Sequence, residues 1–79
     1  MYSLLTKELN NCFNNCFLPH ISLLKSKIKE HIGYETNIVE ICDDCILLNL
    51  IDSNGSNIGY RFNLILHNDK KIIRGIIKV

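Results

Sequence analysis

The sequence contains no tryptophan, no alanine and only one proline, and it has no uninterrupted apolar run of about twenty residues. It therefore predicts no membrane-spanning helix. The start of the chain also lacks the basic, apolar and small-residue order of a secretory signal. There is no repeat, linker or low-complexity segment. We expect one domain over residues 1–79, located in the cytoplasm.

An excess of basic residues is missing as well. The net charge is +1, with four lysines against three glutamates in residues 1–37 and five basic against five acidic residues in 38–79. Proteins that hold nucleic acid through its phosphates need a concentrated basic surface. The totals show no such concentration, so nucleic acid ranks second to protein as the expected partner.

The chain is short for a protein that folds alone. For 79 residues, surface scaling predicts that roughly 63% of the unfolded surface is buried on folding. The composition, 47% hydrophobic and 22% charged, is that of a folded protein. So thin a core is often supplemented by a partner chain or a metal. The heavy use of asparagine and isoleucine fits an AT-rich coding sequence, as in a phage or another mobile element.

Residues 1–33 have the apolar periodicity of a helix. The stripe is formed by Leu5, Leu9, Cys12 and Cys16, with Phe13 and Phe17 beside them, and it resumes at Ile21, Leu24, Ile28 and Ile32. Pro19 removes a backbone donor, which predicts a kink or a break near Leu18. Leu18 would be a poor N-cap, so a kink is favoured. Gly33 is expected to end the helix.

From residue 36 to 79 the apolar period changes to two. We expect strands at Asn37–Cys42 and Cys45–Ile51, and two more within Ile58–Val79, joined by turns at 43–44, 52–56 and 67–70. Short connections favour antiparallel pairing of consecutive strands. The predicted fold class is α+β: an N-terminal kinked helix or helix pair packed on one face of a four-stranded antiparallel meander sheet.

The two faces of this sheet can be assigned by alternation. The side chains expected to point to the helices are Ile46, Leu48, Leu50, Tyr60, Phe62, Leu64, Ile73 and Ile77. The outer face receives Leu47, Ile51, Ile65, Ile72 and Ile76, beside Asn49, Arg61, Asn63, Arg74 and Lys78. One helical layer covers only one face, and an uncovered face is usually polar. Five exposed aliphatic side chains predict a patch of roughly several hundred Å², large enough to indicate a partner.

The leading functional hypothesis is therefore a small non-enzymatic protein-binding module. It would inhibit or regulate a larger protein through the outer face of its sheet, as phage anti-defence proteins of the anti-CRISPR kind do, and we expect the chain to form a homodimer. The expected partner-binding residues are Leu47, Asn49, Ile51, Arg61, Ile65, Ile72, Arg74, Ile76 and Lys78. No catalytic residue, cofactor or metal is expected. The alternative is that some isoleucine is exposed without function in so isoleucine-rich a chain.

Four cysteines offer a second hypothesis, a zinc-stabilised nucleic-acid-binding module. Cys12 and Cys16 are four apart on the expected helix, and Cys42 and Cys45 flank a two-residue turn. Four thiolates suit tetrahedral zinc. The acidic pair in that turn would repel thiolates, which disfavours both zinc and redox chemistry there. We expect small apolar core cysteines on the helix instead, and reduced thiols throughout.

Polar residues cluster at two further places. The turns at 43–44 and 67–69 should lie at one end of the sheet, where Asp43, Asp44, His67 and Asp69 could hold a divalent ion or exchange protons. Turn residues of these types are more often explained by local hydrogen bonds. His20 and His31 have structural explanations at the helix ends. A basic strip on the outer face could include Arg61, Lys70, Lys71, Arg74 and Lys78.

The segment YRFNLILHNDKKIIRGIIKV, after two helices, resembles the ribosome-dependent mRNA-cleaving toxins of bacterial toxin–antitoxin pairs. The resemblance implies an RNA-cleaving activity with Arg61, His67, Lys71 and Arg74 as the candidate residues. The chain departs from that family in having no strand before the helices and no strongly basic balance. An RNA-cleaving toxin is therefore the alternative enzymatic hypothesis.

Overall fold

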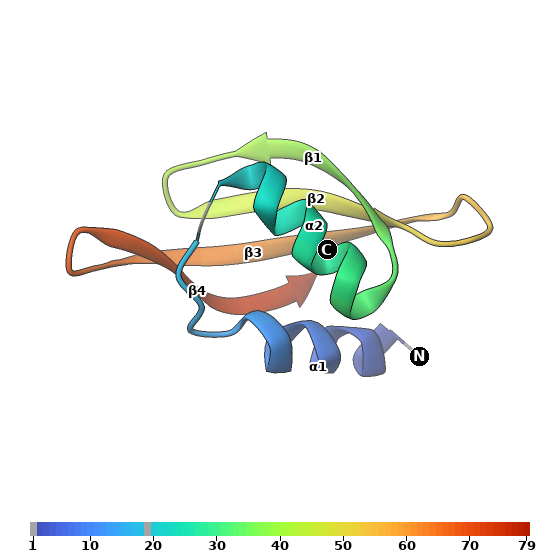
Figure 1. Ribbon diagram of the computed structural model, residues 1–79, viewed down its shortest axis with the longest axis horizontal. Coiled ribbons are helices and arrows are strands. Elements are labelled where there is room, and N and C mark those ends of the chain that lie inside the picture. Colours follow the sequence, from blue (N-terminus) through green and yellow to red (C-terminus); the bar gives the residue numbers. More distant parts are fainter. Residues whose placement is uncertain (1, 19) are drawn as a thin grey trace.

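Two helices are followed by four strands in the computed structural model, which describes residues 2–18 and 20–79. The elements are α1 (Tyr2–Phe13), α2 (Ile21–Ile32), β1 (Glu35–Ile41), β2 (Cys45–Ile51), β3 (Asn57–His67) and β4 (Lys70–Lys78). The strands form one antiparallel sheet in the order β1-β2-β3-β4. Both helices lie on the same side of it, α2 across β1 and β2 and α1 beside β4 (Figure 1). The predicted α+β meander is confirmed.

The helical region is broken rather than kinked. α1 ends at Phe13 and α2 begins at Ile21, with His20 as N-cap in an extended conformation (φ −65°, ψ 150°). The preference for a kink is therefore wrong; Pro19 itself lies outside the described residues. Gly33 ends α2 as predicted: its φ is +87°, and its N–H donates to the carbonyls of Ile28 and Lys29.

The segment between the helices explains the break, because it pairs with the edge strand β4. The N–H groups of Asn15 and Leu18 donate to the carbonyls of Ile73 (2.6 Å) and Lys71 (2.9 Å), and the Ile73 N–H donates to the Cys16 carbonyl (2.9 Å). These bonds use backbone N–H and carbonyl groups that a continuous helix would have paired within itself. The linker thus covers part of an edge that would otherwise expose unpaired backbone groups.

α1 covers a further part of that edge with one side chain. The Asn10 amide donates to the Ile76 carbonyl at 3.0 Å and accepts from the Ile76 N–H at 3.1 Å, as a neighbouring strand would. Its amide nitrogen also donates to the Thr6 carbonyl at 3.0 Å. The pairing fixes α1 against β4 and closes this side of the sheet.

The turns follow their sequence chemistry. Asn68 and Asp69 have φ of 52° and 66°, the positive values that a tight two-residue hairpin turn requires. Asp52 accepts from the N–H groups of Asn54 and Ser56, both at 2.9 Å, and Gly55 has φ +84°. The predicted turns are confirmed. β1 begins and ends slightly before the predicted strand, at Glu35 and Ile41.

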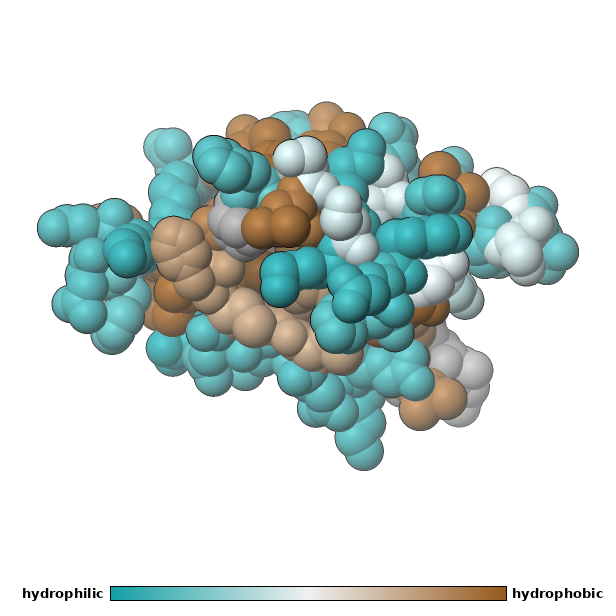
Figure 2. All heavy atoms as spheres, viewed as in Figure 1, coloured by the Kyte–Doolittle hydropathy of each residue, from teal (hydrophilic) through white to brown (hydrophobic). Residues whose placement is uncertain are grey.

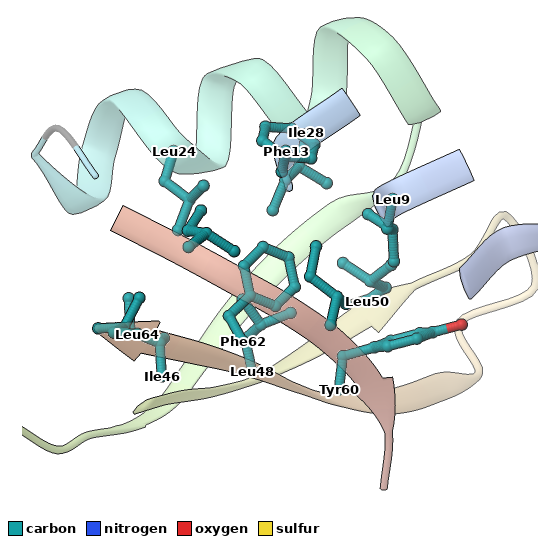
Figure 3. Packing of buried hydrophobic residues seen from close by; sticks show 12 residues of the cluster. Leu9, Phe13, Leu24, Ile28, Ile46, Leu48, Leu50, Tyr60, Phe62 and Leu64 are labelled. Carbon is teal, nitrogen blue, oxygen red and sulfur yellow. The ribbon is translucent and has the colours of Figure 1, made fainter. Parts of the chain in front are cut away.

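The core lies between the helices and the inner face of the sheet. Tyr60 and Phe62 are fully buried at its centre, with Leu9 and Phe13 from α1 and Leu24 and Ile28 from α2 above them (Figure 3). The Tyr60 hydroxyl reaches Thr6 of α1 at 3.0 Å, so this large side chain is buried with its polar atom satisfied.

β4 contains a bulge that reverses the predicted orientation of its last residues. Leu64 pairs with Ile73 but Phe62 pairs with Ile76, so β4 carries one extra residue here, at Arg74-Gly75. Gly75 supplies the φ of +108° that this irregularity uses. Three predictions are therefore wrong: Ile76 is buried, Ile77 is 52% exposed, and Lys78 pairs with Tyr60 on the helix side.

Candidate protein-binding surface

The outer face of the sheet, away from both helices, is built from cross-strand rows. Strand pairing places Glu40, Leu47, Arg61 and Ile77 in one row across all four strands. Asn37, Asn49 and Gly59 form the next row, which Val79 extends by donating its N–H to the Gly59 carbonyl at 3.0 Å. Among the described residues no helix lies over these rows (Figure 1).

Apolar side chains dominate this face. The most exposed are Val79 at 77%, Val39 at 58%, Ile77 at 52% and Ile65 at 40%. Leu47, Ile51 and Ile72 are half-buried beside them. The prediction of an apolar outer face with Leu47, Ile51, Ile65 and Ile72 on it agrees with this placement, while Ile77 replaces Ile76. Alternation does not predict Val39 or Val79 on this face. Val39 lies at a second bulge between Ile38 and Glu40, and Val79 follows the bulge in β4.

A shallow hollow of about 140 Å³ lies near the middle of the face. Gly59 forms its floor, and Val39, Leu47, Asn49 and Val79 stand around it. A Cβ placed on Gly59 would meet the Asn49 Oδ1 at 3.5 Å and the Val79 Cβ at 3.6 Å, which are ordinary contact distances. The hollow therefore exists because residue 59 has no side chain, and a partner's side chain could fill it.

The predicted polar residues of the face are only partly brought together. Arg61 is half-buried, and its Nε donates to the Asn63 Oδ1 at 2.7 Å, so the Asn63 side chain helps to orient the guanidinium. Asn49 borders the hollow, and Arg74 lies exposed at the bulge. Lys71 and Lys78 pair with Leu66 and Tyr60 on the helix side. The basic strip is thus split between two faces.

Charge is divided between the two hairpins of the sheet, which the sequence totals concealed. The β1–β2 hairpin with its flanking turn carries no basic residue and five carboxylates: Glu35, Glu40, Asp43, Asp44 and Asp52. The β3–β4 hairpin carries one carboxylate, Asp69, and five basic residues: Arg61, Lys70, Lys71, Arg74 and Lys78. A division of the chain at residue 38 separates Glu35 from the other four carboxylates of the acidic hairpin. It then adds those four to the charges of the basic hairpin, so the two signs cancel.

The cysteine thiols do not form a site. Cys42 donates to the Glu40 carboxylate at 3.0 Å, and this bond, followed by the neighbouring Cys45, raises the pKa of the Cys42 thiol to about 12. A thiol so hard to ionise is a poor nucleophile and a poor zinc ligand. All four cysteines are free. Cys12 is exposed and Cys16 half-buried outside the helix, so the prediction of core cysteines there is wrong.

A second hollow, of about 80 Å³, lies between the helices on the opposite side of the molecule. Apolar residues form a band there between the polar helix surfaces (Figure 2). Its walls include Cys12, Phe13 and Leu24, with Lys27 and His31 at the rim. Across residues 2–18 and 20–79 there is no group of three or more His, Cys, Asp or Glu side chains that could hold a metal ion.

The rim expected at one end of the sheet is staggered. The Asp44 carbonyl accepts from the Leu64 N–H at 2.8 Å, so the β1–β2 turn ends beside Leu64. His67 lies three residues further along β3, about 10 Å away at the rise of a strand. The two turns share an end of the molecule (Figure 1), but their side chains form no common site.

Three of the four residues suggested by the toxin resemblance are likewise dispersed. Arg61 and His67 lie six residues apart along β3, about 20 Å. Lys71 pairs with Leu66 on the side of the helices, opposite Arg61. An acid–base pair and a phosphate-binding group need to reach one reacting centre, which this arrangement does not provide.

Searches of protein-family models, of curated proteins and of solved structures found no significant match to this chain.

Proposed function

We propose that this protein is a small non-enzymatic protein-binding module whose binding surface is the outer face of its sheet. It would serve as an inhibitor or regulator, either at this face directly or as a homodimer formed through it. The observation that supports the proposal is the exposure of apolar side chains on this face: Val39 and Val79 beside the Gly59 hollow and Ile77 in the neighbouring row are each more than half exposed. Free thiols in all four cysteines suit the reducing cytoplasm in which we place it.

The size and make-up of the face suit a protein partner. The exposed Val39 and Val79 and the half-buried Leu47 surround the hollow. Polar side chains such as Asn37, Asn49 and Arg61 lie on the same face. Protein interfaces combine an apolar centre with polar groups that fix orientation in this way. Within the described residues no helix is long and apolar enough to cross a membrane.

The test compares two charged substitutions at exposed aliphatic residues of the same hairpin. Ile77→Glu alters the outer face, and Leu66→Glu, at a residue 68% exposed near the hairpin tip, is the matched control. Chemical cross-linking in host lysate and in pure protein records every bound protein, including further copies of this chain. We expect Ile77→Glu to lose the cross-linked species and Leu66→Glu to retain them, both with wild-type circular dichroism. Equal retention by both variants would exclude the outer face as a binding surface.

A further inference from the structure

The charge division of the sheet bears directly on what covers its outer face. On the outer face itself, the β1–β2 half carries Glu40 and the β3–β4 half carries Arg61, with Arg74 exposed at the bulge, whereas Lys71 and Lys78 lie on the helix side. A surface with opposite charges on its two halves is complementary to a copy of itself turned by half a revolution. The outer face of one chain is therefore complementary in charge to the outer face of a second copy.

We infer that the occupant of the outer face is a second copy of this chain, related by a two-fold axis parallel to the strands. This inference rests on the proposed function, because it names the partner of the same surface. In that arrangement β1 and β2 of one protomer stack on β4 and β3 of its partner. Sheets that pack face to face keep their strand directions within about 30° of each other, which this axis permits.

The alternative two-fold axis, perpendicular to the strands, is disfavoured by charge. It would stack β1 on the partner's β1 and β4 on the partner's β4, so carboxylates would face carboxylates and basic groups would face basic groups. Like charges juxtaposed in an interface are strongly unfavourable. The axis along the strands replaces each repulsion with an attraction.

One row of the face shows the pairing in detail. In the order β1 to β4 it reads Glu40, Leu47, Arg61 and Ile77. An axis along the strands stacks this row on its own copy in reverse order. Arg61 then lies over Leu47 of the partner subunit, one strand spacing of about 4.8 Å from the partner's Glu40. A guanidinium can bridge that spacing, and Glu40 and Arg61 form two equivalent pairs in the dimer.

The dimensions of the face indicate a weak dimer. Four strands about 4.8 Å apart, with seven residues rising about 3.3 Å each, span roughly 19 by 23 Å. That footprint is roughly 440 Å², about half of the 800 Å² that a standard stable interface buries on each partner, so the dimer belongs with the weak, transient associations. Sedimentation equilibrium should therefore extend to about 500 µM protein.

The experiment uses charge reversal on the two members of the pair. We expect Glu40→Lys and Arg61→Glu each to be monomeric at concentrations where the wild type is dimeric. The dissociation constant of each variant dimer should be at least tenfold higher than that of the wild type. We expect an equimolar mixture of the two variants to regain the dimer mass, because Lys faces Glu at one pair and Glu faces Arg at the other. The double variant E40K/R61E should dimerise by itself, which also shows that both substitutions are compatible with folding.

Two results would overturn the inference. A wild type that is monomeric up to the highest concentration excludes a second copy as the occupant. If Ile77→Glu then still abolishes cross-linking to another protein, the proposed function stands without the dimer. A wild-type dimer that both reversals leave unchanged, or that the mixture does not restore after both have broken it, excludes an axis parallel to the strands.

Discussion

Single residues decide which side chains reach each face of this sheet. Gly75, with φ +108°, allows β4 one extra residue, and Ile76 turns inward while Ile77 turns out. Gly59 leaves a hollow that any larger residue would fill. Cys42 shows the same dependence in its chemistry, because one hydrogen bond to Glu40 suppresses its ionisation.

We predict that Glu40→Gln makes the Cys42 thiol reactive. With a pKa of about 12 against an ordinary 9.0, roughly 0.1% of the thiol is ionised at pH 9, and only the thiolate is alkylated. Removing the carboxylate lowers this pKa, so iodoacetamide should modify Cys42 at least about tenfold faster at pH 9. Peptide mass spectrometry measures the rate, with the exposed Cys12 as internal reference. An unchanged ratio of the two rates would contradict the assignment.

The same pKa has a consequence for stability, because it is raised on folding. The contribution of Cys42 is fully present below pH 9 and is lost as the pH rises from 9 towards about 12. In Glu40→Gln this loss should be smaller, since the folded and unfolded pKa values lie closer together. Urea unfolding of the wild type and of Glu40→Gln at pH 8 and pH 10.5 measures how far the free energy of unfolding falls between the two pH values in each protein.

We predict that Gly75→Ala destabilises the fold by about 1–3 kcal/mol, the cost of a non-glycine residue in a sparsely populated backbone conformation. Space is not the cause, since the nearest atom to a Cβ there is the Asn63 Nδ2 at 3.9 Å. Gly59→Ala is the matched control, because its backbone is not left-handed. Its free energy of unfolding in urea should change by less than about 0.5 kcal/mol. Equal effects at both glycines would contradict the role of the bulge.

At the scale of elements, the strands were more predictable than the connections around them. Alternation of two is a local signal, and it located β2 from Cys45 to Ile51 without error. The break between α1 and α2 depends on backbone bonds to β4, more than fifty residues away, which no local pattern encodes. The bulge in β4 could have been predicted from the sequence, because Gly75 lies inside a strand pattern and a glycine in that position favours an irregularity.

We predict that Asn10→Ala costs about 1–3 kcal/mol, because it leaves the Ile76 backbone groups without their partner at the edge of the sheet. Asn11→Ala, at the exposed neighbouring position, should be neutral or slightly stabilising, since alanine is the better helix former. Chemical unfolding gives both values. If Asn11→Ala destabilises as much as Asn10→Ala, the edge-covering role of Asn10 is excluded.

The whole molecule has one closed side and one open side. α1 and the linker cover the β4 edge, both helices cover the inner face, and the outer face is left with its apolar rows (Figure 1). The apolar character of that face could be predicted from alternation alone. The division of the sheet into an acidic and a basic hairpin could not be seen from charge totals, because it emerges only when charges are counted by hairpin.

The most direct test of self-association through the outer face is a dilution series monitored by methyl NMR of isoleucine-labelled protein. The account predicts concentration-dependent shifts for Ile65, Ile72 and Ile77, which lie on the outer face. Ile28, buried beneath α2, should remain unchanged. Shifts confined to isoleucines of α2, or no shift at any concentration up to about 500 µM, would contradict association through this face.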